Sequence, residues 1–261
     1  SPSFDASQSD IGTALLAGAS IHIGGPSLAR DPSALIQALC DHRISHLDIP
    51  PSLLRLLPQD CAPEHLRTLV IGGEVCPAET VRWWAGRCRV VNVYGPTEAT
   101  ICTSMIACDS ATWERAMIGQ PIAGVSYRVL DEERRDVGCG GVGELYIGGI
   151  ALARGYRGQP ALTAQRFVEV EAELYFRSGD LVRVHADGLA FLGRADRQVK
   201  HAGVLVAPEE VEAALCAVAG VRACAVRQEH VGGRSVLVAY CVIDDDTDVE
   251  AVRRAAAAQL P

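Results

Sequence analysis

The chain has 261 residues, of which 49% are hydrophobic and 21% charged, and its formal net charge is −8. This composition supports a sizeable core and excludes a disordered chain, while the negative balance argues against nucleic acid or a membrane surface as a partner. No apolar run reaches the roughly 18 residues of a membrane span, and the start does not resemble a signal peptide. We therefore expect a cytoplasmic protein of one large or two smaller domains.

The ten cysteines form no Cys-x-x-Cys pair, so neither a zinc ribbon nor a redox motif is indicated. Most of them lie in apolar runs, and we interpret them as small core residues in a reducing compartment. The seven histidines show no metal-ligand spacing and are interpreted as surface or capping residues.

The first hundred residues alternate between helical and extended patterns. A helix is expected from residue 11 to Gly18, followed by a short strand at 21–23. A second helix opens at Asp31-Pro32, with proline in its first turn, and a third opens at Pro77. Apolar strands are expected at 45–49, 69–71 and 89–93. This alternation predicts an α/β fold with a mostly parallel sheet core.

The carboxyl ends of these strands carry the polar residues. In parallel sheets ligands bind at that edge, where this chain places Asp48, residues 72–74 and the turn 94–98. The turn offers the ring of Tyr94, the hydroxyl of Thr97 and the carboxylate of Glu98, which suit a nucleotide with Mg²⁺. Taken alone, the stretch favours an ordinary strand-to-turn transition over a nucleotide site.

The pattern of predicted helices and strands changes twice further along the chain. From about residue 116, short strands at 127–130, 144–148 and 189–192 are separated by glycine-rich turns, which predicts a β-rich subdomain. After residue 194, an acidic helix at 208–215, two strands and a final helix predict a small, incomplete α+β subdomain. The expected domains are residues 1–115, 116–195 and 196–261.

Three motifs stand in order along the chain. They are Tyr94-Gly95-Pro96-Thr97-Glu98; Gly143-Glu144-Leu145-Tyr146-Ile147-Gly148-Gly149 with Ala153-Arg154-Gly155-Tyr156; and Ser178-Gly179-Asp180-Leu181 with Gly193-Arg194-Ala195-Asp196-Arg197-Gln198-Val199-Lys200. With Phe4-Asp5-Ala6-Ser7 near the start, they closely resemble the adenylation domains of nonribosomal peptide synthetases, within the adenylate-forming superfamily. The resemblance covers essentially the whole chain.

The resemblance implies amino-acid activation in the biosynthesis of nonribosomal peptides, a class of secondary metabolites that includes antibiotics. ATP and an amino acid would give an aminoacyl adenylate and pyrophosphate. The aminoacyl group would then pass to the phosphopantetheine thiol of a peptidyl carrier protein. ATP and Mg²⁺ are the implied cofactors, and a small helper protein is a further candidate partner.

The resemblance also assigns roles to residues. Tyr94 would stack on adenine, Asp180 would hold the ribose hydroxyls, and Arg194 would approach the ribose and phosphates. Thr97 would contact phosphate and Glu98 would hold Mg²⁺. The other nucleotide-binding positions would be Gly72, Gly73, Glu74, Asn92, Gly95 and Pro96.

Two more residues receive roles in the reaction cycle. Asp196 would be the hinge about which the small subdomain rotates. Lys200 would join Thr97 and Glu98 among the catalytic residues, in the thiolation pose, although it could equally be a solvated surface lysine. Glu144 is interpreted as structural, and Trp83-Trp84 as packing residues.

For the amino-acid pocket, the resemblance implies that Asp5 pairs with the α-ammonium group. The pocket positions would be Asp5, Ala6, Ser9, Asp48, Val70, Gly72, Val93, Ile101 and Cys102. A partly desolvated carboxylate is costly unless it is paired, so Asp48 favours a cationic or polar substrate side chain, such as that of arginine, lysine or ornithine. The alternative is that Asp48 faces water at the end of its strand.

Some family features are missing from this sequence. No phosphate loop rich in glycine, serine and threonine precedes Phe4, and no Asn-Gly-Lys segment follows Pro261. We therefore expect a fragment, truncated at both ends, that is not active alone. Two alternatives stay open: an acyl- or aryl-CoA ligase of the same superfamily, which Asp5 disfavours, and a non-catalytic nucleotide-binding or scaffold module.

Overall fold

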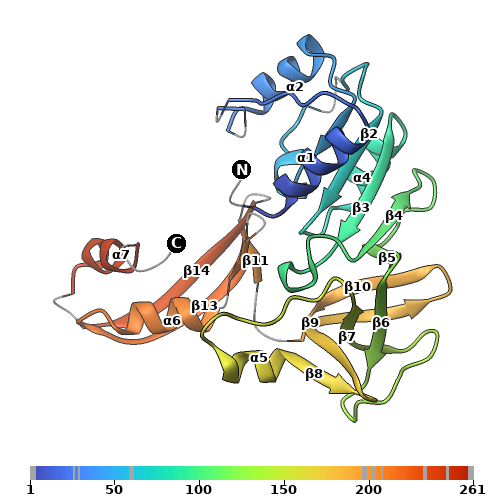
Figure 1. Ribbon diagram of the computed structural model, residues 1–261. Helices are drawn as coiled ribbons and strands as arrows, with labels where there is room; N and C mark the ends of the chain where they lie inside the picture. Colours follow the sequence, from blue (N-terminus) through green and yellow to red (C-terminus); the bar gives the residue numbers. More distant parts are fainter. Residues whose placement is uncertain are drawn as a thin grey trace. The chain divides into compact units, whose positions relative to one another are not determined.

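The computed structural model describes residues 4–25, 27–28, 30–58, 62–195, 199–201, 204–206, 208–231, 234–244 and 247–257. The chain divides into two compact units, Ser1–Ala195 and Asp196–Pro261 (Figure 1). One hydrogen-bonded sheet runs past residue 115 and does not mark a boundary there. The predicted subdivision of the larger part near that residue stays a prediction.

Three parallel strands begin the sheet of the larger unit. They are β1 (His46–Asp48), β2 (Thr68–Gly72) and β3 (Arg89–Tyr94). The chain between and before them forms α1 (Ala6–Leu16), α2 (Pro32–Asp41), α3 (Pro51–Leu54) and α4 (Ala78–Ala85). The Asp31 carboxylate caps α2 by accepting hydrogen bonds from Ser33 N and Ala34 N, both at 3.0 Å. The alternation of helices and parallel strands confirms the predicted α/β fold class.

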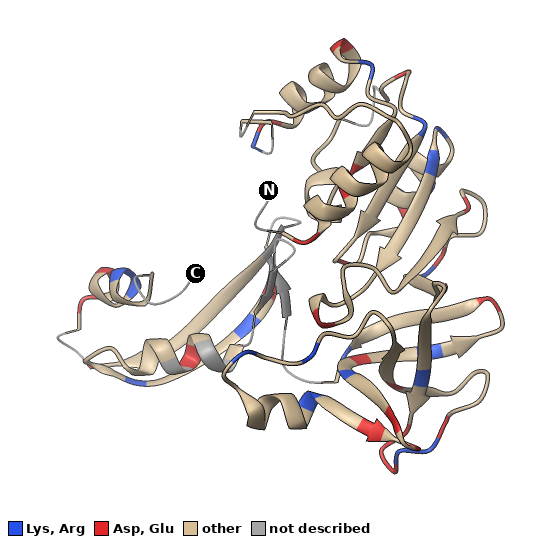
Figure 2. Cartoon of the chain, viewed as in Figure 1, with Lys and Arg blue, Asp and Glu red and all other residues tan. Residues whose placement is uncertain are grey.

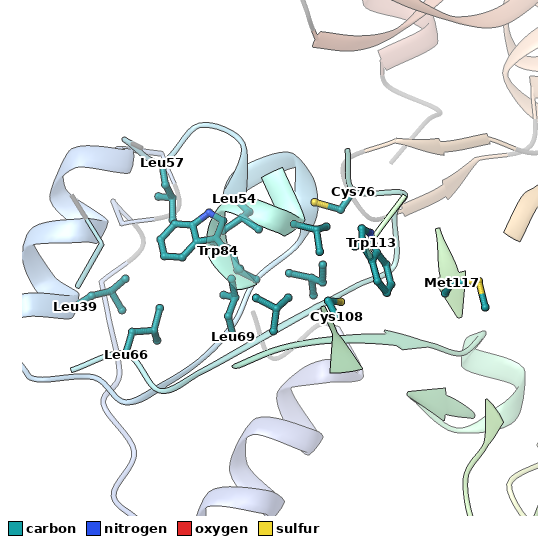
Figure 3. Close-up of a cluster of buried hydrophobic side chains, with 14 of the residues drawn as sticks. Leu39, Leu54, Leu57, Leu66, Leu69, Cys76, Trp84, Cys108, Trp113 and Met117 are labelled. Atoms are coloured by element: carbon teal, nitrogen blue, oxygen red, sulfur yellow. The ribbon is translucent and has the colours of Figure 1, made fainter. Parts of the chain in front are cut away.

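The first core forms where α2, α3 and α4 meet these strands (Figure 3). Leu69 and Ile71 alternate along β2 and are fully buried, as the two-residue period of a strand requires. Trp84 of α4 is 1% exposed and fills the centre of this cluster. This burial confirms its interpretation as a packing residue.

Antiparallel strands extend the sheet beyond β3. They are β4 (Ser104–Cys108), β5 (Met117–Pro121), β6 (Val125–Leu130), β7 (Val142–Gly149), β8 (Phe167–Val170), β9 (Glu173–His185) and β10 (Gly188–Arg194). The sheet order is β1-β2-β3-β4-β5-β10-β9-β7-β6, with β8 paired to β9. Helix α5 (Pro160–Arg166) precedes β8, and a second core packs around Leu145, Ile147 and Val182. This is the predicted β-rich part, and it carries the motif at residues 178–181.

Ion pairs gather at one end of the β-rich part, where residues of both signs are interspersed (Figure 2). Arg128 of β6 donates hydrogen bonds to Asp136 and to Glu171, the latter at 2.8 Å. Both carboxylates are paired with this one guanidinium, so we assign the three groups a structural role.

The smaller unit has the predicted α+β composition. Its described elements are β11 (Val199–His201), β12 (Val204–Val206), α6 (Pro208–Cys216), β13 (Val221–Val231), β14 (Arg234–Ile243) and α7 (Val249–Ala257). Strands β13 and β14 form an antiparallel hairpin, and its core combines Leu215, Val226 and Val252.

Two expectations are wrong in detail. The segment 21–23 forms no strand: no described strand pairs with it, Ile23 is 88% exposed, and an unpaired strand is not stable in water. The cysteines are not uniformly core residues, because Cys139, Cys216 and Cys241 are exposed.

Candidate active site

The turn after β3 is a rigid loop. Gly95 packs so closely that a Cβ there would lie 2.5 Å from the carbonyl oxygen of Ile101. A short 3-10 helix, Thr97–Ala99, follows, and Thr100 and Ile101 then adopt positive φ angles of 55° and 66°. Thr103 N closes the loop by donating to Tyr94 O at 2.8 Å. Non-glycine residues with positive φ are uncommon and occur where surrounding contacts enforce them, so this turn presents its side chains in fixed directions.

A buried polar network joins this turn to the motif at residues 178–181. The Tyr94 hydroxyl donates to Asp180 Oδ2, and Arg194 Nη1 donates to Asp180 Oδ1 at 2.9 Å and to Ser178 O at 2.8 Å. Asp180 is 2% exposed. Burial, and then the Asp180 charge, raise the pKa of Tyr94 well above its usual value, so its phenol stays a donor. The structure thus brings together three predicted nucleotide-binding residues.

Glu144 supports this network from β7. Its carboxylate accepts hydrogen bonds from Arg177 Nε at 2.9 Å and from Gly179 N at 3.1 Å. It therefore fixes the backbone next to Asp180, in agreement with the structural role expected for it.

The two residues predicted to handle phosphate and metal lie on the 3-10 helix. Thr97 Oγ1 donates to Asp5 Oδ2 at 3.0 Å, and Glu98 Oε1 accepts from the Tyr156 hydroxyl at 2.5 Å. Tyr156 is part of a quoted motif, yet no role was predicted for it. Burial and Glu98 raise its pKa, so the phenol is a protonated donor at neutral pH.

The Thr97–Asp5 hydrogen bond places the predicted phosphate contact beside the predicted ammonium contact. Asp5 stands immediately before α1, and Ala6 and Ser9 lie on that helix. The residue expected to contact phosphate and the residue expected to bind the α-ammonium group are therefore direct neighbours in the larger unit.

The positions predicted to line the base are engaged by the protein itself. Glu74 accepts from Ser52 N at 2.9 Å and from Ser52 Oγ at 3.1 Å, and Asn92 Nδ2 donates to Met117 O at 2.8 Å. Close packing explains why glycine stands at position 72, since a Cβ there would lie 2.6 Å from Val93 O. Contact of Gly73, Glu74 or Asn92 with a base stays a prediction.

The expected amino-acid pocket lies at the ends of β1, β2 and β3. The register pairs Asp48 with Val70, and Gly72 with Val93, so these four residues share one edge of the sheet. Burial, and then the neighbouring Asp10 carboxylate, raise the pKa of Asp48 to about 6.

The other members of that pocket follow the turn. The Asp48 charge is close enough to contribute to the raised pKa of Cys102, although burial is the larger cause. Ile101 precedes Cys102, and the Cys102 thiol donates to Ser104 O at 3.1 Å. Asp48 is thus half-buried rather than fully solvated at its strand end, and neither Asp10 nor Cys102 would neutralise its charge.

Asp10 was not predicted as a site residue. It lies four residues after Ala6 on α1, and residues spaced by four share a helix face. Its pKa is raised by burial, against a lowering effect of His46. The helix was predicted to begin at residue 11. A predicted start at Ala6 would have placed Asp10 on the same helix face as Ala6, a predicted pocket residue.

Two predicted residues have no described place in this site. Asp196 lies outside the described residues. Lys200 belongs to β11 in the smaller unit, and its side chain likewise lies outside the described part. Their roles stay predictions.

The donor chemistry at the turn fits Mg²⁺. Glu98 supplies a carboxylate and Thr97 a hydroxyl, and Mg²⁺ prefers a few hard oxygen ligands completed by water and substrate phosphates. Among the described residues, no group of three or more histidine, cysteine or acidic side chains forms a metal cage.

Comparison with known proteins decides the family. The family model described as "AMP-binding enzyme" matches residues 1–157. The chain belongs to this family. A probable non-canonical nonribosomal peptide synthetase, CymA of Salinispora arenicola, is 44% identical over 94% of this chain and 3% of its own length. The delta-poly-L-ornithine synthetase of Acinetobacter baumannii is 36% identical over 100% of this chain and 20% of its own length.

The comparison with solved structures agrees with the comparison of sequences. NpsA-ThdA, an artificially fused adenylation-PCP di-domain synthetase from Klebsiella oxytoca, superposes with a TM-score of 0.82 at 25% identity, covering 99% of this chain and 50% of that one. The resemblance to nonribosomal peptide synthetase adenylation domains is confirmed. The chain spans half or less of the length of each protein named here. None of its described helices is long and apolar enough to cross a membrane.

Proposed function

We propose that this chain contributes the nucleotide and amino-acid sites of an amino-acid-activating ligase in cytoplasmic nonribosomal peptide synthesis. The amino-acid carboxylate attacks the α-phosphorus of ATP, the bond to the β-phosphate breaks, and aminoacyl adenylate and pyrophosphate result. The observation that carries this proposal is the 3.0 Å hydrogen bond between Thr97 and Asp5, because it joins the phosphate side and the ammonium side of one site.

In this proposal the buried network orients the nucleotide. Tyr94 lies against adenine, while Asp180 accepts hydrogen bonds from the ribose hydroxyls and Arg194 adds positive charge beside it. The nucleotide is expected to replace or share contacts that the three residues now make with one another. Holding both reactants in line accelerates the reaction because the loss of translational and rotational freedom is already met on binding.

Glu98 and Thr97 would hold Mg²⁺ and a phosphate oxygen. When bound, Mg²⁺ neutralises charge on the departing pyrophosphate. Asp5 pairs with the α-ammonium group of the amino acid, which distinguishes amino acids from plain carboxylic acids.

We further propose that the substrate side chain is cationic, or at least a hydrogen-bond donor. Asp48 is half-buried, and both burial and Asp10 disfavour its charged form. A substrate ammonium or guanidinium group would offset that cost by pairing with Asp48. The similarity to a relative named for poly-ornithine is consistent with this class.

The partner would be a peptidyl carrier protein, whose phosphopantetheine thiol accepts the aminoacyl group and releases AMP. The likeness to an adenylation-PCP fusion supports this assignment. Lys200 and Asp196 would act in that second half-reaction.

Exchange of labelled pyrophosphate into ATP tests the proposal, using a protein that carries this chain and the parts that its longer relatives have. Ornithine, lysine or arginine should stimulate exchange, and Asp5→Ala should abolish it, whereas Asp41→Ala on the exposed face of α2 should not. Exchange with aliphatic amino acids alone would refute the cationic assignment. Absence of exchange with every amino acid would refute the activity.

A further inference from the structure

The loop after β7 holds Glu98 at two separate points. Ala153 N donates to the backbone oxygen of Glu98 at 2.8 Å, and the Tyr156 hydroxyl donates to its carboxylate Oε1 at 2.5 Å. A third contact lies close by, since Thr100 Oγ1 donates to Ala151 O at 2.6 Å. The segment 151–156 therefore clamps the turn that carries Glu98.

Tyr156 is itself fixed by its surroundings. Its backbone N–H donates to Thr163 Oγ1 of α5 at 2.9 Å, and its ring meets Phe167 edge-on at a centroid distance of 5.8 Å. The preceding Gly155 has φ of +129° and lies against the Thr163 side chain, where no Cβ would fit. The phenol is thus aimed at Glu98 by an anchored backbone and a packed ring.

We propose that Tyr156 is a positioning residue for magnesium, which orients the Glu98 carboxylate by donating to one oxygen and directing the other, Oε2, toward the ion. This inference rests on the proposed function, since it takes Glu98 as the metal-holding group. A carboxylate at the end of a glutamate side chain rotates freely unless one of its oxygens is fixed. Hydrogen bonds to ligating carboxylates commonly set the affinity of the metal site.

A purely structural role for Tyr156 makes a different prediction. The ring contact with Phe167 and the Thr163 hydrogen bond would both survive in Tyr156→Phe, because only the hydroxyl oxygen is removed. If packing were the whole role of Tyr156, metal affinity would not change. If the hydroxyl orients Glu98, metal affinity falls while the fold is kept.

The test measures Mn²⁺ affinity by electron paramagnetic resonance, in the presence of α,β-methylene-ATP, for the protein that carries this chain and its flanking parts. We expect Tyr156→Phe to bind Mn²⁺ about ten-fold more weakly. The matched control is Tyr175→Phe, since the Tyr175 hydroxyl also donates to a glutamate, Glu173, at 3.0 Å but lies away from the turn. The control should bind Mn²⁺ like the parent protein, and thermal unfolding of each variant reports the fold.

A double-mutant cycle shows whether the effect passes through Glu98. Glu98→Gln should weaken Mn²⁺ binding, and adding Tyr156→Phe to it should produce no further loss. Unchanged Mn²⁺ affinity in Tyr156→Phe, or full additivity of the two losses, would overturn the inference. An unchanged affinity in Glu98→Gln would remove the metal role of Glu98 and the inference with it. If the metal results hold and no amino acid supports pyrophosphate exchange, the proposed activity fails alone.

Discussion

At the scale of single residues, the raised pKa of Asp48 makes the stability of the fold depend on pH. Its folded-state pKa of about 6 lies above the ordinary value of 3.8, so the folded protein holds this proton more tightly than the unfolded chain. Folding therefore becomes less favourable as the pH rises from about 4 through 6, and the full cost remains above that range. From the pKa difference, the cost is at most about 3 kcal/mol.

Asp48→Asn should remove this pH dependence. The free energy of unfolding of the variant relative to the parent should be near zero at pH 4 and should increase to a gain of at most about 3 kcal/mol at pH 7 to 8. Urea unfolding across that pH range measures it, with Asp187→Asn in the exposed β9–β10 turn as the control. A difference that stays constant from pH 4 to 8 would show that Asp48 keeps its ordinary pKa.

The Asp180–Arg194 pair gives a second prediction at this scale. Only 4% of the Asp180 side chain and 12% of the Arg194 side chain are exposed. Arg194→Ala leaves the carboxylate buried with less compensation, and we expect a loss of roughly 3–5 kcal/mol in the free energy of unfolding. Arg135→Ala, which removes a 70% exposed partner of Asp131 and Glu133, should change stability little. Equal losses in the two variants would contradict a structural role for the buried pair.

At the scale of elements, the turn between β3 and β4 depends on the close packing of Gly95. Gly95→Ala would press a methyl group against the backbone of residues 101–103. We expect a loss of about 1–3 kcal/mol in stability and weaker ATP binding, measured by urea unfolding and calorimetry. Gly138→Ala is the control, since nothing lies within 4 Å of the added atom. Parent-like ATP binding in Gly95→Ala would show that the turn does not form the nucleotide site.

The helices and strands of the core could be predicted because their local sequence patterns agree with the contacts that they make in the fold. Proline and an aspartate cap mark the start of α2, and alternating burial follows the strand pattern in β2. The segment 21–23 has the same apolar pattern but no partner strand, which a local pattern cannot reveal. Strand β9 escaped prediction because Gly179 and the polar residues of its motif interrupt its pattern.

The site could be predicted only in part, for a related reason. Motif order identified Tyr94, Glu98, Asp180 and Arg194 as candidates. It could not show that Tyr94 and Asp180 share a hydrogen bond, because the fold alone brings together residues 86 positions apart. Tyr156 and Asp10 were not predicted because only the fold brings Tyr156 to Glu98 and Asp10 near Asp48.

At the scale of the whole molecule, the chain combines a larger unit that holds the described site residues and a smaller α+β unit that holds Lys200. We propose that the larger unit binds nucleotide and amino acid and that the smaller unit supplies groups for thiol transfer. For the larger unit, we propose that one site binds ATP and an α-amino acid and joins them.

Trapping the aminoacyl adenylate with hydroxylamine tests this claim most directly. The protein that carries this chain and its flanking parts is incubated with ATP, Mg²⁺ and ornithine, lysine or arginine, each beside its analogue lacking the α-ammonium group, and hydroxamates are measured by mass spectrometry. We predict a hydroxamate from at least one cationic amino acid and none from its analogue, because the proposed contact of Asp5 needs the α-ammonium group. No hydroxamate from any of the three amino acids, or equal yields from the analogues, would contradict a site that joins ATP to a cationic amino acid.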